Sequence, residues 1–170
     1  MSLLIVKSAV GNGPEIQNAI QKLTARALEF EVIDTNALCI LPCKGCCTCM
    51  LSTPGECCIQ DDNERLLKAY LQYDHIVFIV DTALNYIDHK AKNIIDRIFP
   101  LVSVLTRFHR GEILHIPRYE TILRTAILYT GHADRELLND WMIRFEKNMT
   151  GVSLGAFPIE EAEEVCKCIL

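Results

Sequence analysis

The sequence has few basic residues, no long hydrophobic run and none of the signature motifs of several common enzyme classes. Lysine and arginine number 17 against 22 aspartate and glutamate residues. The resulting formal charge of −5 argues against nucleic acid or an anionic membrane surface as the main partner. No apolar stretch approaches the ~20 residues that a membrane-spanning helix needs. Ser-His-Asp, HExxH and GxxxxGK(S/T) patterns are missing, which excludes common hydrolase, zinc-protease and nucleotidase interpretations.

Both ends of the sequence also lack targeting signals. Met1 to Val6 leads directly into strand-like sequence, without the basic and long apolar regions of a secretory signal. Near the other end, Cys168 stands one position too late for a prenylation motif. We therefore expect a cytoplasmic protein without a lipid anchor.

Length and composition predict a single domain over residues 1–170, because 50% of the residues are hydrophobic and two domains would each have too small a core. Short apolar runs typical of buried strands alternate five times with amphipathic patterns typical of helices. This alternation indicates an α/β fold with a parallel sheet, in which ligands bind at the carboxyl ends of the strands. We expect strands at 3–7, 30–33, 75–80, 125–129 and 151–157, helices at 14–27, 61–71, 91–98, 134–147 and 159–170, and a turn at 110–111.

Cysteine is the most unusual component, with nine residues in the chain and seven of them in the segment 39–58. Without a secretory signal, clustered thiols indicate metal binding or redox chemistry rather than a disulfide scaffold. Two-residue gaps let successive thiolates converge on one centre, and three close thiolates with a fourth more distant one are typical of iron–sulfur ligation. Zinc held by four thiolates is the chemical competitor. The four residues that follow this C-x2-C-x2-C-x7-C pattern, called here the four-thiol frame, are Cys43, Cys46, Cys49 and Cys57.

Other interpretations of the same thiols stay open. Cys47 and Cys58 lie outside the frame and are expected to point away from the shared centre. They would serve as alternate ligands or as plain thiols. Unligated cysteines are commonly buried as small apolar side chains, and a disulfide or regulatory thiol pair is a further alternative. Beside the frame, Asp61-Asp62 is expected to cap a helix, and Asp96-Arg97 is expected to form a structural or surface pair.

The cysteine segment and its surroundings resemble one known family. The pattern Pro42-Cys43-x-Gly45-Cys46-x2-Cys49, followed by Pro54-Gly55-x-Cys57-x-Ile59-x-Asp61-Asp62, is similar to the NAD(P)H-dependent FMN reductases and iron–sulfur flavoproteins. Weaker similarities follow in Val77-Phe78, in Lys92 with Ile95-Asp96-Arg97, and in His115-x-Pro117-Arg118-Tyr119.

This resemblance implies a flavodoxin-like three-layer sandwich with a five-stranded parallel sheet in the order 2-1-3-4-5. It implies electron transfer through FMN at the carboxyl ends of the strands, a flavin or nicotinamide cofactor, a redox partner, and a homo-oligomer (dimer or tetramer). Some members hold a [4Fe–4S] cluster, whereas others keep several of the cysteines and bind no metal, so the resemblance leaves the metal question open.

The loops that hold FMN in the resembled family are only partly preserved. In the first loop, Ser8, Asn12 and Gly13 are serviceable, but Pro14 removes an amide donor and Glu15 places a negative charge where the phosphate should bind. The second loop aligns at 80–85, where Ala83 replaces the ring-stacking tyrosine. Binding residues in the second and third loops would be Asp81, Thr82, Asn85, Tyr86 (in place of the lost tyrosine), Thr130 and Gly131.

Two functions are therefore carried forward. The first is an electron-transferring oxidoreductase with FMN and a cysteine-ligated centre nearby. The second is a flavin-less relative that acts as a metal-binding or thiol redox module. No residue is assigned a catalytic role, and the damaged phosphate loop predicts that FMN, if it binds, binds weakly.

Overall fold

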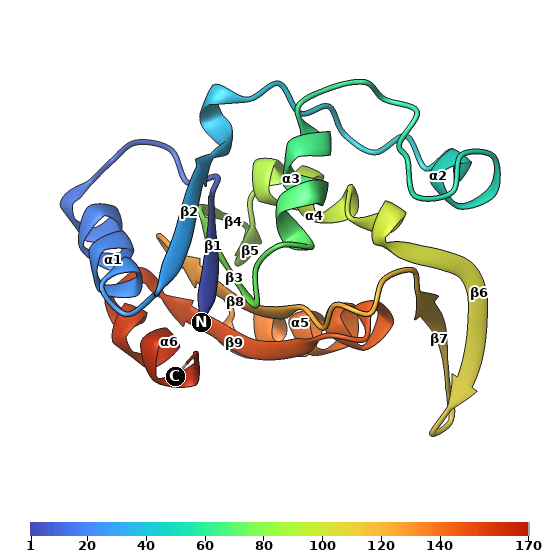
Figure 1. Ribbon diagram of the computed structural model, residues 1–170. Helices are drawn as coiled ribbons and strands as arrows, with labels where there is room; N and C mark the ends of the chain where they lie inside the picture. Colours follow the sequence, from blue (N-terminus) through green and yellow to red (C-terminus); the bar gives the residue numbers. More distant parts are fainter. Residues whose placement is uncertain (170) are drawn as a thin grey trace.

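Five parallel strands form the central sheet of the computed structural model, which describes residues 1–169 (Figure 1). Their order is β2-β1-β3-β8-β9, and every neighbouring pair is parallel. Because β8 and β9 are the fourth and fifth parallel strands, this order confirms the predicted 2-1-3-4-5 flavodoxin-like sheet. The strands are β1 (Ser2–Lys7), β2 (Glu29–Asp34), β3 (His75–Val80), β8 (Arg124–Tyr129) and β9 (Val152–Pro158).

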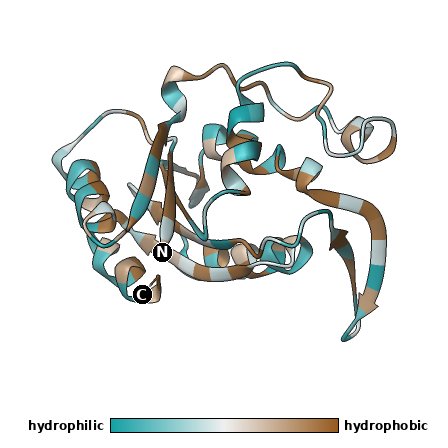
Figure 2. Ribbon diagram, in the orientation of Figure 1, coloured by the Kyte–Doolittle hydropathy of each residue, from teal (hydrophilic) through white to brown (hydrophobic). Residues whose placement is uncertain are grey.

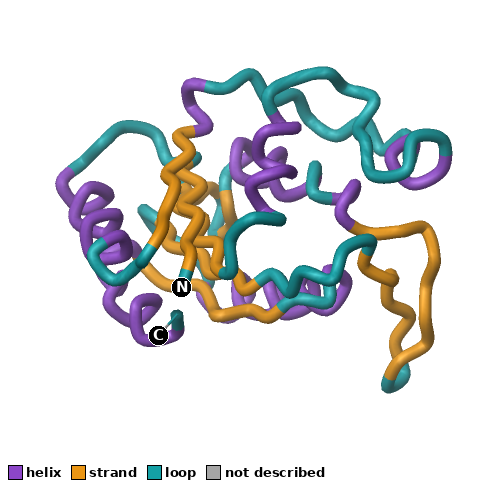
Figure 3. The backbone as a smooth tube through the Cα atoms, in the orientation of Figure 1, coloured by secondary structure: helices purple, strands orange, loops and turns teal. Residues whose placement is uncertain are grey.

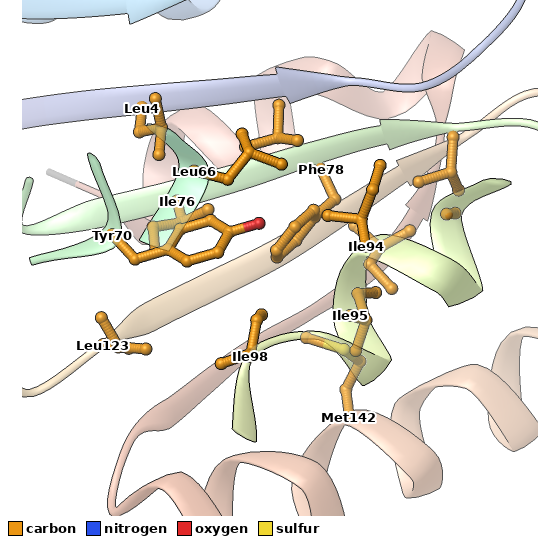
Figure 4. Packing of buried hydrophobic residues seen from close by; sticks show 14 of the residues in the cluster. Leu4, Leu66, Tyr70, Ile76, Phe78, Ile94, Ile95, Ile98, Leu123 and Met142 are labelled. Carbon is orange, nitrogen blue, oxygen red and sulfur yellow. The ribbon is translucent and has the colours of Figure 1, made fainter. Parts of the chain in front are cut away.

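Helices cover both faces of the sheet and make the predicted three layers. α1 (Pro14–Thr24) and α6 (Ala162–Cys168) pack on one face, and α3 (Asn63–Tyr70), α4 (His89–Asp96) and α5 (Arg135–Met149) pack on the other. Successive residues of a strand point to opposite faces, so a strand covered on both sides must be apolar throughout. One face receives Leu3, Ile5, Val77, Ile79 and Leu128, and the other, part of which Figure 4 shows, receives Leu4, Val6, Ile76, Phe78 and Ile127.

Local signals explain where the helices begin. Pro14 is the first residue of α1, a position where its missing N–H costs no hydrogen bond. The Asp88 carboxylate accepts a hydrogen bond from the Ala91 amide at 2.9 Å and caps α4, and Asp134 caps α5 through the Leu137 amide at 3.0 Å. Short 3-10 turns complete the connections at η1 (Thr35–Ala37), η2 (Phe99–Leu101) and η3 (Ile159–Glu161).

The structure also contains two antiparallel hairpins that the sequence patterns do not predict. The first pairs β4 (Thr82–Ala83) with β5 (Tyr86–Ile87), and the second pairs β6 (Val102–His109) with β7 (Glu112–Pro117). The second hairpin turns at Arg110 and Gly111, both with positive φ, so the turn expected there is confirmed. It extends away from the sheet in Figure 1, and Figure 2 shows hydrophobic colouring along it; its exposed apolar residues include Val104, Leu105, Phe108 and Ile113.

The cysteine-rich segment runs as a loop between η1 and α3 (Figure 3). The one regular element in it is the short helix α2 (Thr48–Leu51). All nine cysteines are thiols rather than disulfides in residues 1–169. Within the same residues, no helix is both long and apolar enough to cross a membrane.

One charged side chain in the core lacks a partner of opposite charge. Lys7 pairs with Asp34 and Arg97 pairs with Asp61, but in the described part of the chain Glu146 of α5 has no cation beside it and is 1% exposed. The Thr125 hydroxyl donates a hydrogen bond to one of its oxygens. Burial raises the pKa of Glu146 to about 8, and the hydrogen bond from Thr125 only partly opposes that rise.

Replacing this group should change how stability depends on pH. Native Glu146 keeps its proton up to about pH 8, whereas the unfolded chain ionises it near its ordinary pKa of 4.5. Between these values the unfolded state binds fewer protons, so the contribution of this group to stability falls with rising pH, by about 1.4 kcal/mol per pH unit. Glu146→Gln should therefore exceed the parent in stability by a few kcal/mol at pH 8 and by little at pH 4.5, measured by urea unfolding. The exposed change Glu136→Gln on the same helix is the control, and equal pH slopes in parent and Glu146→Gln would refute the prediction.

Candidate functional site

Three loops meet at the carboxyl edge of the sheet, and a single carboxylate joins two of them. They follow β1 (residues 8–13), β3 (residues 81–86) and β8 (residues 130–134). Oδ2 of Asp81 accepts a hydrogen bond from the Val10 amide at 2.8 Å, and Oδ1 accepts one from the Thr130 hydroxyl. Asp81 therefore holds the first and third loops against the second.

The β4–β5 hairpin closes this edge. Thr82 Oγ1 donates to the Thr130 carbonyl at 2.7 Å, and a Cβ at Gly131, whose φ is +76°, would meet the same Oγ1 at 2.9 Å. Gly131 is therefore needed both for its backbone conformation and for this close approach. Asn85 Oδ1 lies 2.8 Å from His132 Nδ1, and the Asn85 carbonyl accepts from the amide that starts the turn into α5.

The hairpin tip and the ring of Tyr86 face different surroundings. Leu84 is fully exposed at the tip, with a positive φ of 52°. The Tyr86 ring instead packs edge-on against Trp141 of α5, with ring centroids 5.3 Å apart, and burial raises its pKa. The structure therefore brings together Asp81, Thr82, Asn85, Thr130 and Gly131, whereas Tyr86 packs toward α5.

The first loop keeps amide donors but not the electrostatics of an anion site. Ser8 is buried, and both its amide and its hydroxyl contact the Ile79 carbonyl, at 2.8 and 3.5 Å. The amides of Gly11, Asn12 and Gly13 make no hydrogen bond within residues 1–169. The Glu15 carboxylate folds back over this position, because a Cβ placed on Gly13 would lie 2.7 Å from its carboxyl carbon.

These contacts decide how a flavin fits. A phosphate at the start of α1 would meet the Glu15 carboxylate, and the neighbouring Val10 amide is already bonded to Asp81, so the phosphate does not fit the residues as they stand. Exposed apolar side chains suit a flat ring better: Val10 is 62% exposed and Leu84 is 100% exposed. The residues at this edge therefore do not fit the charged end of FMN, and they leave two apolar side chains exposed.

A buried ion pair anchors the cysteine segment. Arg97, at the end of α4, donates to both carboxylate oxygens of Asp61, at 2.7 and 2.9 Å, and both side chains are at most 3% exposed. Arg97 also donates to the carbonyls of Leu41 at 2.7 Å and Ile59 at 3.4 Å. Both flanks of the cysteine loop are therefore tied to one guanidinium.

The same contacts correct one expectation from the sequence and refine a second. Arg97 pairs with Asp61 rather than with its neighbour Asp96, which binds Lys92 instead. Asp62 holds the N-cap position of α3, yet its side chain accepts from the Cys39 amide at 2.7 Å. The bond to the start of α3 comes from Asp61 instead, whose Oδ1 accepts from the Asn63 amide at 3.1 Å. Burial alone would raise the pKa of Asp61, but hydrogen bonds from Arg97 and from nearby amides outweigh it and lower that pKa.

Among the thiols, one sulfur–sulfur contact joins two cysteines that the sequence does not predict to pair. Cys46 Sγ lies 3.5 Å from Cys58 Sγ and accepts a hydrogen bond from the Thr48 hydroxyl at 3.2 Å. Thr48, through its side chain and backbone, and then Cys58 lower the pKa of Cys46 to about 7. Burial, and then the neighbouring Cys57 and Cys43, raise the pKa of Cys49.

Neighbouring thiols do not amount to a ligand set. Across residues 1–169, no group of three or more histidine, cysteine, aspartate or glutamate side chains is placed to hold a metal ion. The frame therefore does not fit a metal or cluster in this arrangement, and the metal assignment of Cys43, Cys46, Cys49 and Cys57 stays a prediction from the sequence.

The fold and the edge loops together define a class of protein. A five-stranded parallel sheet in this order, with the strand-to-helix loops gathered at its carboxyl edge, is flavodoxin-like. No family model matches the chain, and no characterised protein matches its sequence.

Solved structures identify the class further. An NAD(P)H:quinone oxidoreductase from Methanothermobacter marburgensis matches 99% of this chain and 95% of its own length, with a TM-score of 0.64 at 13% identity. An FMN-dependent NADH-azoreductase from Bacillus anthracis, solved with FMN, matches 99% and 96%, with a TM-score of 0.57 at 9% identity. A flavone reductase matches 99% of this chain with a TM-score of 0.57 at 17% identity, but the chain spans only 59% of that protein. This protein therefore has the fold of the flavin-dependent NAD(P)H reductases.

The Asp61–Arg97 pair should be essential for stability. Asp61→Asn leaves the Arg97 guanidinium buried without a counter-charge, and we expect a loss of about 3–5 kcal/mol in the free energy of unfolding. The neighbouring change Asp96→Asn removes an exposed ion pair with Lys92 and should cost at most about 1 kcal/mol. Urea unfolding of both variants checks this, and equal effects would contradict the anchoring role.

Proposed function

We propose that the chain is a flavin-using oxidoreductase, in which the carboxyl edge of the sheet binds a flavin reversibly and electrons pass from a nicotinamide donor to an acceptor. The observation that carries the proposal is the fold likeness, over 99% of the chain, to an NAD(P)H:quinone oxidoreductase and an FMN-dependent NADH-azoreductase. A flavin supplies hydride and single-electron chemistry that side chains do not offer.

Residues of all three edge loops would contact the flavin or support the residues that do. Val10 and Leu84 would contact the faces of the ring, and the open amides of Asn12 and Gly13 would donate hydrogen bonds to the polar chain of the ligand. Ser8 and Tyr86 would hold the loops from beneath. Together with Val10 and Leu84, the proposed site contains Ser8, Asn12, Gly13, Asp81, Thr82, Asn85, Tyr86, Thr130 and Gly131.

Charge at this edge would make the flavin exchangeable. Glu15 and Asp81 are both acidic, so a dianionic phosphate gains little there, and a neutral flavin loses little by comparison. The proposed ligand is therefore a flavin recognised through its ring rather than a permanently held FMN.

Flavin titration tests this proposal. The parent should bind FMN no better than riboflavin. A charge-assisted hydrogen bond contributes about 1.5–3 kcal/mol, so restoring an amide donor and removing the carboxylate in Pro14→Asn/Glu15→Thr should tighten FMN binding on the order of a hundredfold. Riboflavin affinity should stay nearly unchanged, as measured by quenching of flavin fluorescence.

A control variant separates an effect at the phosphate position from a general effect of removing a carboxylate. Glu29→Gln removes an exposed carboxylate at the start of β2, on the opposite edge of the sheet, and should change neither affinity. Much tighter binding of FMN than of riboflavin by the parent would show that the interpretation of the loop is wrong. Failure to bind either flavin would refute the proposed function itself.

The remaining assignments follow the same proposal. Exposed Phe108 and Ile113 on the β6–β7 hairpin support a homo-oligomer, as a dimer or tetramer, since large apolar side chains gather at contact surfaces. We place the protein in the cytoplasm with a separate redox partner, acting as one domain over residues 1–170.

A flavin-less thiol or metal module is the second candidate, and one observation favours it. Cys46 and Cys58 are in contact, with their sulfur atoms 3.5 Å apart, in a segment that is largely exposed. To hold zinc or a [4Fe–4S] cluster, the loop would have to rearrange and separate Cys46 from Cys58. The thiol form of this candidate needs no such rearrangement.

Metal analysis decides between the two forms. Protein purified without oxygen should contain substoichiometric iron and zinc and show no cluster absorption, because the described thiols do not converge on one centre. The opposite result would be stoichiometric metal that disappears in Cys43→Ala and Cys57→Ala but remains in Cys47→Ala. That pattern would establish the four-thiol frame as a ligand set.

A further inference from the structure

The two flanks of the cysteine loop are held side by side by contacts that involve no cysteine. Arg97 binds the Leu41 carbonyl before the thiols and the Ile59 carbonyl and Asp61 carboxylate after them. The Leu41 amide adds a hydrogen bond to Asp61 at 2.9 Å. Residues 41 and 59–61 are therefore fixed relative to each other, and the loop between them starts and ends at one place.

Within this loop, Cys46 and Cys58 approach from opposite flanks. Their sulfur atoms are 3.5 Å apart, and a disulfide bond is about 2.05 Å long, so a small movement of an irregular segment joins them. Gly45 and Cys47, on either side of Cys46, both have positive φ, which turns the chain sharply at that cysteine. Both cysteines of the pair are exposed, so a small molecule can reach them.

Adjacent thiols are placed differently. Cys57, next to Cys58, lines a cavity of about 350 Å³ together with Arg97, Leu101 and Tyr119. Cys49 is partly covered, and Cys47 Sγ contacts the Gly45 carbonyl rather than another sulfur. Cys46 and Cys58 are therefore the cysteine sulfurs that share a hydrogen bond within residues 1–169.

We propose that Cys46 and Cys58 form a redox-active dithiol that exchanges with low-molecular-weight disulfides. The Cys46 thiolate attacks one sulfur of the small disulfide, a mixed disulfide forms, and the other half leaves as a thiolate. The Cys58 thiolate then attacks Cys46 Sγ, which forms the Cys46–Cys58 bond and expels the second half. Two electrons pass from the protein thiols to the small disulfide, and the two thiol protons end on the released thiols. An excess of small thiol reverses both steps.

This inference goes beyond the proposed flavin chemistry and does not depend on it. The second step is intramolecular and joins two thiols already in contact. The Cys46–Cys58 disulfide should therefore form faster than the mixed disulfide accumulates. The same pairing disagrees with the four-thiol frame, in which Cys46 is a ligand and Cys58 points elsewhere.

Peptide mapping tests the proposal on the whole, reduced protein. The protein is treated with oxidised glutathione and a chelator without oxygen, remaining thiols are alkylated, and the chain is cut after Lys44 and Glu56. These cuts place Cys46 and Cys58 on different peptides, so the bond appears as a linked pair in non-reducing mass spectrometry. We expect this linkage to dominate, with the other thiols alkylated.

Matched variants assign the bond to its residues. Cys46→Ser should abolish the linked pair and leave Cys58 alkylated or carrying glutathione, and Cys58→Ser should do the reverse. Cys47→Ser removes an adjacent exposed thiol and should leave closure unchanged. A dominant bond between other cysteines, persistent glutathione on both residues, or metal that survives the chelator and protects Cys46 would each overturn the proposal.

Discussion

The ion pair between Asp61 and Arg97 is the contact on which the organisation of the cysteine segment depends. A guanidinium removed from water needs a counter-charge and partners for its N–H groups, and here Asp61 and the carbonyls of Leu41 and Ile59 supply them to its two terminal nitrogens. The loop has little regular structure of its own, so these bonds, rather than a helix or strand, set where its flanks lie. The proximity of the thiols follows from this anchor.

A second carboxylate, that of Asp81, organises the carboxyl edge of the sheet. Asp81 satisfies the Val10 amide and the Thr130 hydroxyl and thereby fixes the edge of the sheet. Together with Glu15 over Gly13, it makes this edge acidic at the place where the fold would otherwise receive a phosphate. An azoreductase of the same fold has been solved with FMN. Here the corresponding edge is acidic, while the exposed Val10 and Leu84 offer an apolar surface.

Sequence patterns predict the sheet because the strands are apolar on both faces, and His75–Val80 is found with the expected bounds. The hairpins escape prediction because β6 is mostly exposed and shows no buried run. The Asp61–Arg97 pair joins residues 36 positions apart, which no local spacing reveals. The four-thiol frame assumes a regular turn between successive cysteines, but Gly45 and Cys47 have positive φ, and this irregular backbone brings Cys46 to Cys58 instead.

Amide chemical shifts recorded while riboflavin is added to the protein are the most direct test of the proposal that a flavin binds at the carboxyl edge through its ring. We expect shifts concentrated at residues 10–13, 82–86 and 130–132, with the cysteine loop and the cavity beside Arg97 unaffected. Shifts centred on that cavity, or none at all at saturating riboflavin, would contradict it.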